Sequence, residues 1–223
     1  MVGPRAKLAA PSDAGTQIVA AATRLFAAHG FDGTTVQDIA DAVGVTKPAI
    51  LHHFASKEQL RQAVLEGILA HWNQTLPRLL LKATASEARF DAVFEELLDF
   101  FASDPDRARV LVREGLDRPE ETKRLLRGPV QPWLQAVARY IHGGQKSGDH
   151  YDDVDPEAYV VHILQLVLVA TASSAVTQAA ITKDARRRYV RELARIAKAA
   201  LFPKQKKPTS RRPSRRSSKP KES

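Results

Sequence analysis

The spacing of apolar residues is the feature that most restricts how this chain can fold. Apolar side chains recur three and four residues apart through most of the sequence, as at Val36, Ile39, Ala40 and Val43, and this is the period of one face of an α-helix. No sustained alternation of apolar and polar residues, the pattern of a strand, occurs between turn pairs. The sequence therefore predicts an all-α protein, and 223 residues can bury a core in one or two domains.

Short local signals place the first helix ends. The first helix carries its apolar face from Ile18 to Phe26 and ends at Gly30, which suits the left-handed position beyond a helix. Gly44 ends the second helix in the same way. Thr34 with Gln37 three residues later fits a capping box at the start of that second helix.

Similar signals divide the rest of the chain. Ser56 with Gln59 fits another capping box, which opens a long helix running towards Pro77. Asp104–Pro105 and Asp155–Pro156 each combine an N-cap residue with proline at the first helical position. We expect the later helices over residues 86–103, 105–116, 119–127, 130–147, 156–180 and 184–201.

Two short helices, expected over residues 35–43 and 47–54, are joined only by Gly44, Val45 and Thr46. Two helices with a short turn containing glycine form a helix-turn-helix motif. With Ile50 and Phe54 packed inward, the outer face of the second helix carries Lys47, Pro48, Ala49, Leu51, His52 and His53. A helix that enters a major groove needs small residues for close approach and donors for bases and phosphates, so this face predicts DNA contact.

The adjacent histidines also suggest a metal site as an alternative. Neighbouring residues on a helix point about 100° apart, and neither a carboxylate nor a third histidine stands at ligand spacing. The chain has no cysteine, which removes thiolate ligands as well. We therefore expect no metal and no cofactor.

Residues 16–63 resemble the DNA-binding domain of the TetR (tetracycline repressor) family. The matching features are the end of the first helix, LFAAHGF, then TTVQDIADAVGVTKPAILHHF, then SKEQL. The pattern is dense over about 48 residues, while the remainder matches only in outline. The resemblance implies an N-terminal three-helix domain with a helix-turn-helix, followed by a helical domain that binds a small-molecule effector and forms a homodimer through its last two helices.

The resemblance also implies roles for individual residues. Thr34 or Thr35, together with Lys57, would hold phosphates at the flanks of the motif. His53 would bond a phosphate or support the helix. At Leu51 the family often has a tyrosine that contacts DNA, whereas a leucine makes only apolar contact, for example with a thymine methyl. The residues nearest the bases would be Thr46, Lys47, Pro48 and His52.

A ligand site is expected among the middle helices. They carry large side chains that belong either to the core or to an apolar pocket with a few polar tips, the usual form of a small-molecule site. The candidate pocket residues are Phe90, Phe94, Phe101, Trp133, Tyr140 and His162.

The net charge of +9 is concentrated at the C-terminus. The last 21 residues hold nine Lys or Arg and one Glu, so they carry +8 of the +9. Their proline, serine and charge content predicts a disordered tail, with either a non-specific attraction to nucleic acid or a solubilising role alone. We accordingly divide the chain into an arm (1–15), the helix-turn-helix domain (16–63), a regulatory and dimerisation domain (64–202) and the tail (203–223).

Two apolar surfaces predict a dimer. Residues 160–170 are apolar on nearly every side, and the last helix adds a stripe that includes Leu193 and Ile196. One subunit has too few other helices to cover both, so we expect a second copy to pack there. The apolar run of residues 163–172 is too short to span a membrane and no signal peptide is evident, so we expect a soluble cytoplasmic protein.

The expected function is sequence-specific transcriptional regulation. The partners would be a pseudo-palindromic double-stranded DNA operator and an unknown small-molecule effector that releases the protein from it. One alternative is a ligand-independent architectural DNA-binding protein that uses the tail. Another is a helical enzyme acting on small molecules, which is less favoured because no nucleophile–base or metal-binding set is present.

Overall fold

The computed structural model describes residues 11–82, 86–180 and 184–203, and every regular element within those ranges is helical. This confirms the predicted all-α fold. The tail beyond Pro203 and most of the predicted arm lie outside the described residues. The elements are α1 (Pro11–His29), α2 (Val36–Val43), α3 (Lys47–His53), α4 (Lys57–Lys82), α5 (Ser86–Ser103), α6 (Pro105–Asp117), α7 (Pro119–Arg127), α8 (Gln131–Ser147), α9 (Pro156–Ala172), α10 (Ser174–Thr177), the 3-10 turn η1 (Gln178–Ala180) and α11 (Ala185–Leu201).

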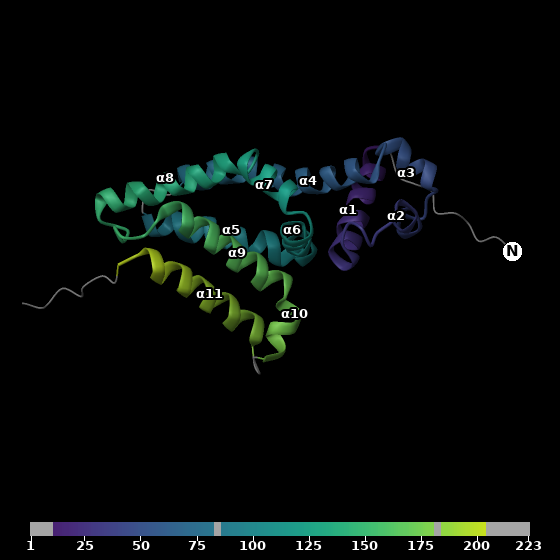
Figure 1. Ribbon diagram of the computed structural model, residues 1–223. Coiled ribbons are helices and arrows are strands. Elements are labelled where there is room, and N and C mark those ends of the chain that lie inside the picture. The colour runs from purple at the N-terminus through teal and green to yellow at the C-terminus, as the bar shows by residue number, and fades with distance from the viewer. Residues whose placement is uncertain (1–10, 83–85, 181–183, 204–223) are drawn as a thin grey trace, which may run out of the picture.

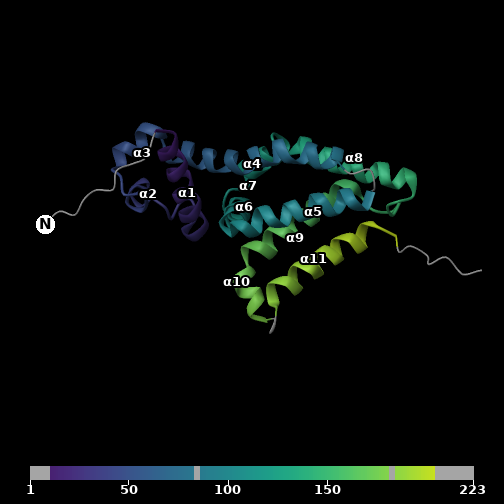
Figure 2. The ribbon, with the colours of Figure 1, turned by 180° about the vertical axis from the view of Figure 1, so that it is seen from behind.

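Helices α1, α2 and α3 form a small unit at one end of the elongated molecule (Figures 1 and 2). Ile18 of α1, Ile39 of α2 and Ile50 of α3 are fully buried in its core. Gly30 and Gly44 have φ values of 76° and 77°, so both adopt the left-handed conformation predicted for them. The predicted inward face of the helix-turn-helix is therefore confirmed.

The capping box of α2 differs from the prediction by one residue. The N-cap is Thr35, whose hydroxyl accepts a hydrogen bond from the backbone N–H of Asp38, while the Asp38 carboxylate accepts from the N–H of Thr35 at 2.7 Å. Thr34 with Gln37 was the wrong pair, because Thr34 is buried and its hydroxyl donates to the carbonyl of Gly30 at 2.8 Å.

Helix α4 leaves the N-terminal unit and continues into the rest of the molecule (Figure 1). Ser56 caps it as predicted, since its hydroxyl accepts from the N–H of Gln59 at 3.1 Å. The helix was expected to run towards Pro77 but passes through it to Lys82. A proline inside a helix removes one backbone hydrogen bond, and burial of Trp72 and Leu76 just before it holds this part of the helix against the core.

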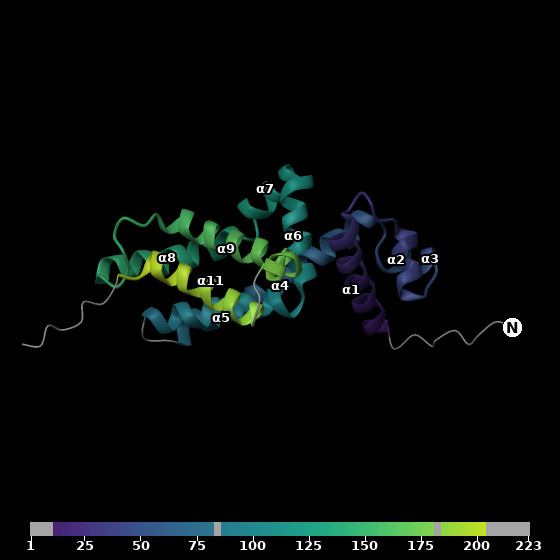
Figure 3. The same ribbon diagram turned by 90° about the horizontal axis from the view of Figure 1, so that it is seen from below.

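The remaining helices form a second, larger unit that extends away from α1–α3 (Figure 3). Asp104 and Asp155 cap α6 and α9 as predicted, each accepting a bond from a backbone N–H of the first turn. The helix expected over 156–180 is broken after Ala172, and the two parts meet at 71°. Ser173 donates its hydroxyl to the carbonyl of Val169 at 2.7 Å, and such back-bonding by serine or threonine bends helices.

Among the described residues, no single helix has both the length and the apolar composition needed to cross a membrane. Only the bent pair formed by α9 with residues 174–180 passes that test as a unit. Helix α9 is also not buried all round within one chain, because Val161, Leu166 and Val169 are exposed on one side of it.

Candidate DNA-binding surface and ligand cavity

Helix α3 presents the predicted polar face to solvent. Thr46 is its N-cap, and the threonine hydroxyl accepts a bond from the N–H of Ala49 at 3.4 Å. Pro48 stands in the first turn, where a missing N–H leaves no helical bond unmade. Ile50 holds the helix by its buried side, while Ala49 is half-buried and the outer face exposes Lys47, Pro48, Leu51, His52 and His53.

The residues predicted at the flanks of the motif differ in their accessibility. Thr34 is 0% exposed, so the prediction that it touches a phosphate is wrong; its neighbour Thr35 is exposed. Bonds from the Thr35 hydroxyl and N–H lower the pKa of the Asp38 carboxyl, which keeps the cap charged. The ammonium of Lys57 donates to the carbonyls of Phe31 and Thr34, both at 2.9 Å, and so ties the start of α4 to the turn before α2.

The aromatic ring of Phe31 contacts cationic side chains of both units. The Phe31 ring lies 4.2 Å from Nζ of Lys57 and 4.6 Å from Cζ of Arg118, measured to the ring centroid. The guanidinium of Arg113 on α6 donates to the carbonyls of Ala27 and Ala28, both at 3.0 Å, at the C-terminal end of α1. Helix α6 is therefore bonded directly to the DNA-binding unit.

A buried ion pair lies beside this joint. Nη1 of Arg61 on α4 donates to the Glu114 carboxylate of α6 at 2.5 Å, and Glu58 also accepts from the Arg61 side chain. Burial raises the pKa of the Glu114 carboxyl, an effect that the charge of Arg61 opposes. Because Glu114 also lines the cavity described next, it touches both the ligand space and the helix that leads to the DNA-binding unit.

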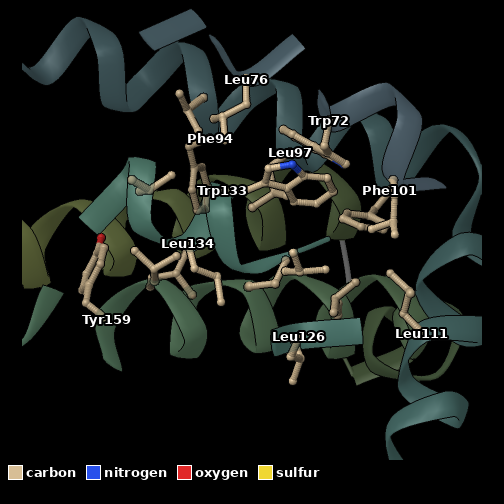
Figure 4. Close-up of a pocket in the computed structure, with 18 of the residues that line it drawn as sticks. Trp72, Leu76, Phe94, Leu97, Phe101, Leu111, Leu126, Trp133, Leu134 and Tyr159 are labelled. Carbon is tan, nitrogen blue, oxygen red and sulfur yellow. The ribbon is translucent and has the colours of Figure 1, made fainter. Parts of the chain in front are cut away.

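A cavity of about 230 Å³ lies within the larger unit and is lined by side chains from α4 to α9 and from α11 (Figure 4). Trp72 and Leu76 of α4, Phe94 and Leu97 of α5, and Trp133 of α8 project towards this common space (Figure 4). An apolar cavity with a few polar atoms is the usual form of a small-molecule site.

Five of the six predicted pocket residues line this cavity: Phe90, Phe94, Phe101, Trp133 and Tyr140. The prediction for His162 is wrong, because it lies on the exposed side of α9, next to Val161. Sequence reasoning missed Trp72 and Tyr159, among others. Their aromatic type was a usable signal at both positions.

Two side chains of the cavity wall use their polar groups in hydrogen bonds to neighbouring residues. The indole N–H of Trp133 donates to Oδ1 of Asn73 at 2.7 Å. The Tyr159 hydroxyl donates to the carbonyl of Ala197 on α11 at 2.6 Å, and burial raises the pKa of that hydroxyl, so it stays a neutral donor. In the described part of the chain, no three histidine, aspartate or glutamate side chains gather as metal ligands would.

An exposed helix-turn-helix joined to a helical unit with an internal cavity defines a class of DNA-binding proteins. Residues 18–64 match the family model described as "Bacterial regulatory proteins, tetR family". The N-terminal unit of the chain therefore matches the DNA-binding domain of that family.

Curated relatives agree with this match. The chain is 26% identical over 125 residues to IcaR of Staphylococcus aureus, a negative regulator of the biofilm operon icaADBC, and the match covers 56% of this chain. It is 28% identical over 142 residues to the transcriptional repressor NicS of Pseudomonas putida, covering 61% of this chain. Each match spans 66% of the relative's length.

Solved structures show that the fold extends along most of the chain. The ketosteroid transcriptional regulator KstR2 of Mycobacterium tuberculosis aligns with a TM-score of 0.69 at 18% identity, over 90% of this chain and 100% of that one. The fatty acid degradation regulator FadR of Bacillus halodurans aligns with a TM-score of 0.68 at 18% identity, over 86% and 96%. Their folds therefore include the helices that enclose the cavity.

Proposed function

We propose that the chain is a homodimeric, sequence-specific transcriptional repressor that a small-molecule effector releases from its operator. The observation that carries the proposal is that the outer face of α3 is exposed, while the inner side of the helix-turn-helix is buried in the core of its unit. The match of residues 18–64 to the family model and the two repressors among the relatives support the same function. On this proposal the protein acts on DNA, and we expect it in the cytoplasm.

On DNA, α3 enters the major groove with its N-terminal turn foremost. Lys47 and His52 supply donors to base edges, while Pro48 and Ala49 allow close approach and Leu51 offers an apolar contact to a thymine methyl. Thr35, His53 and Lys57 lie at the flanks, where phosphates pass. A dimer reads a pseudo-palindrome when its two α3 helices lie roughly 34–36 Å apart, one turn of the duplex, or somewhat more.

Release from DNA follows from thermodynamic linkage between the cavity and the DNA-binding surface. A ligand in the cavity that binds better to a form in which the α3 helices are wrongly spaced shifts the population away from DNA. Helices α4 and α6 both contact the cavity and the DNA-binding unit, through residues such as Arg61, Glu114 and Arg113, and so provide the physical connection.

The test begins with selection of bound fragments from random double-stranded DNA. A single enriched pseudo-palindrome is the expected result. On that operator, Lys47→Ala and His52→Ala each weaken binding by roughly 1–3 kcal/mol and leave binding to random DNA nearly unchanged. Lys123→Ala is the matched control, because Lys123 is an exposed lysine on α7. Equal losses on operator and random DNA for Lys47→Ala and His52→Ala would remove the base-reading role.

The selection also separates the alternatives. An architectural protein that relies on charge binds all fragments with a strong salt dependence and enriches none. Residues 11–60 alone do not supply such charge, since the lysines and arginines of this unit do not outnumber its acidic residues. The relatives are regulators rather than enzymes.

A further inference from the structure

The cavity wall is almost entirely hydrocarbon. Of the described side chains that line it, only three are neither aliphatic nor aromatic: Arg89, Glu114 and Thr122. Water in such a space finds few hydrogen-bond partners, so an apolar molecule that displaces it is favoured by the hydrophobic effect. The part of a ligand that lies among these side chains is therefore expected to be apolar.

The two charged side chains of the wall are already compensated. Glu114 is 7% exposed, and its carboxylate accepts a hydrogen bond from Nη1 of Arg61 at 2.5 Å. Arg89 already has a partner as well. A cationic ligand would therefore compete with Arg61 for Glu114, and an anionic ligand would compete with the existing partner of Arg89. Because burying an uncompensated charge is costly, either charge on the ligand is disfavoured.

Two hydroxyl groups of the wall use their hydrogens within the protein. The Thr122 hydroxyl donates to the backbone carbonyl of Glu114 at 2.8 Å, and the Tyr159 hydroxyl donates to the carbonyl of Ala197 at 2.6 Å. Each hydroxyl oxygen keeps a lone pair that can accept. A single alcohol group on a ligand can therefore find an acceptor, whereas a molecule with many hydroxyl or amide groups would bury most of them without partners.

The volume of the cavity indicates the size of a suitable probe. An apolar cavity of about 150 Å³ accommodates benzene, so one of about 230 Å³ has room for roughly nine carbon atoms. On the side of α7 the wall is half-exposed, because Leu126 lines the cavity and is 40% exposed. A probe slightly smaller than the cavity keeps its polar group among the lining side chains and therefore tests the cavity itself.

We propose that the cavity binds an uncharged, largely hydrocarbon molecule and discriminates against anions and cations of the same size. This assignment rests on the proposed ligand-responsive function and names the class of ligand. The apolar wall supplies the affinity, and the discrimination arises because both charged side chains of the wall are already engaged. The shape of the hydrocarbon is not part of the assignment.

The chain carries its own reporter for the test. Both of its tryptophans, Trp72 and Trp133, line the cavity, so intrinsic fluorescence reports directly on occupancy (Figure 4). Wild-type protein without DNA is titrated with four compounds that share one hydrocarbon frame: ethylcyclohexane, cyclohexylethanol, cyclohexylacetate and cyclohexylethylamine. At neutral pH the first two are uncharged, the third is an anion and the fourth is a cation.

We expect a saturable change in fluorescence with both uncharged compounds. Each ion should bind at least about tenfold more weakly than cyclohexylethanol, because its charge must leave water without gaining a free partner. Either ion binding within that factor of cyclohexylethanol would overturn the assignment. The absence of a saturable change with both uncharged compounds would overturn it too.

A pair of variants locates the bound compound. Val93→Phe adds a ring to the lining of the cavity and should weaken cyclohexylethanol binding about tenfold or more, because the interior has little spare volume. Val112→Phe is the matched control, since Val112 of α6 is half-buried without lining the cavity. Circular dichroism verifies that both variants are folded, and the wild-type series depends on neither. Equal effects of the two substitutions on binding would place the compound outside the cavity and overturn the assignment.

The outcomes also separate this assignment from the proposed function. Selective binding of the uncharged compounds by a protein that selects no operator would overturn the proposed function and leave the cavity assignment standing. Operator selection by a protein that binds the ions as tightly as the alcohol would overturn only the cavity assignment.

Discussion

Position 144 in α8 has no room for a side chain larger than the hydrogen atom of glycine. A Cβ at this position in α8 would lie 2.1 Å from Nδ1 of His150. The imidazole cannot move aside easily, because it is buried, bonded to the carbonyl of Ile141 at 2.9 Å, and packed edge-on against Tyr140 and Phe202. The loop after α8 is thereby anchored under α11.

We expect Gly144→Ala to destabilise the protein by about 1–3 kcal/mol, because overpacking displaces the ring or the helix. Gly143→Ala is a control in the same helix, since an added Cβ there meets nothing within 4 Å. The control should be neutral or stabilising by up to about 1 kcal/mol, the helix preference of alanine over glycine. Urea unfolding followed by circular dichroism measures both. Equal effects of the two substitutions would show that His150 does not restrict the site.

At the scale of elements, α6 determines how the two units are held together. It gives Arg113 to the end of α1 and Glu114 to Arg61 of α4, while Arg109 donates to the carbonyl of Ala172 at the end of α9 at 3.1 Å. One helix therefore bonds to the DNA-binding unit on one side and to a helix of the cavity wall on the other.

Arg113→Ala should loosen the end of α1 specifically. Hydrogen bonds to charged groups contribute about 1.5–3 kcal/mol, and each 1.4 kcal/mol corresponds to a factor of about ten in an opening equilibrium. We expect amide hydrogen exchange in the last turn of α1 to become about tenfold faster or more. Arg109→Ala is the comparison on the same helix and should leave that turn unchanged while exposing the end of α9. Identical exchange patterns for the two variants would contradict this division of roles.

Local signals in the sequence predicted most element boundaries, and the errors arose where distant contacts decide. The caps at Ser56, Asp104 and Asp155 each depend on a few consecutive residues, so the local sequence was enough to predict them. Thr34 was chosen over Thr35 because only the tertiary fold shows which hydroxyl faces inward. Pro77 lies inside a helix because neighbouring burial outweighs its local cost.

The candidate sites were predictable to different degrees. The outer face of α3 followed from helical spacing alone, because the helix is short and one side is clearly apolar. Among the aromatic residues that line the cavity, size identified Phe90, Phe94, Phe101, Trp133 and Tyr140, whereas Trp72 and Tyr159 were missed. His162 was misplaced because periodicity cannot show which side of an apolar helix such as α9 faces the cavity.

At the scale of the whole molecule, one chain leaves an apolar surface uncovered. Val169 is 54% exposed on α9 and Ile196 is 45% exposed on α11, and Val161, Leu166 and Val176 are exposed in the same region of the chain. Leu193 on α11, by contrast, is only 6% exposed and packs inside its own chain. Ile196 is therefore available to a second copy in the proposed dimer, whereas Leu193 contacts its own chain.

Ile196→Asp should give a folded monomer, because it places a charge on the exposed apolar face without entering the core. Leu193→Asp should unfold the chain, because an unpaired charge would be buried. Light scattering at micromolar concentration and circular dichroism distinguish the two outcomes. Operator binding should fail in both. A wild-type protein that is monomeric at 24.6 kDa, yet binds its operator tightly, would rule out the two-groove mechanism.

The basic tail belongs to this scale too, although it lies outside the described residues. Truncation after Phe202 removes +8 of the net +9 charge. We expect the operator preference to remain, with lower affinity for random DNA and a shallower dependence on salt, because fewer counterions are released on binding. Fluorescence anisotropy over a series of salt concentrations checks this. An unchanged slope would mean that the tail makes no contact with DNA.

Helix α4 also has a mechanical consequence. It runs without interruption from Lys57, beside the recognition motif, to Trp72 in the cavity wall, and its missing backbone bond lies beyond that point, at Pro77. The stretch between the two sites is thus a stiff rod about 22 Å long. A tilt of about 5° at the cavity end carries the other end through about 2 Å. We therefore expect α4 to act as a lever, so that a ligand slightly too large for the cavity would change the spacing of the two α3 helices in the proposed dimer.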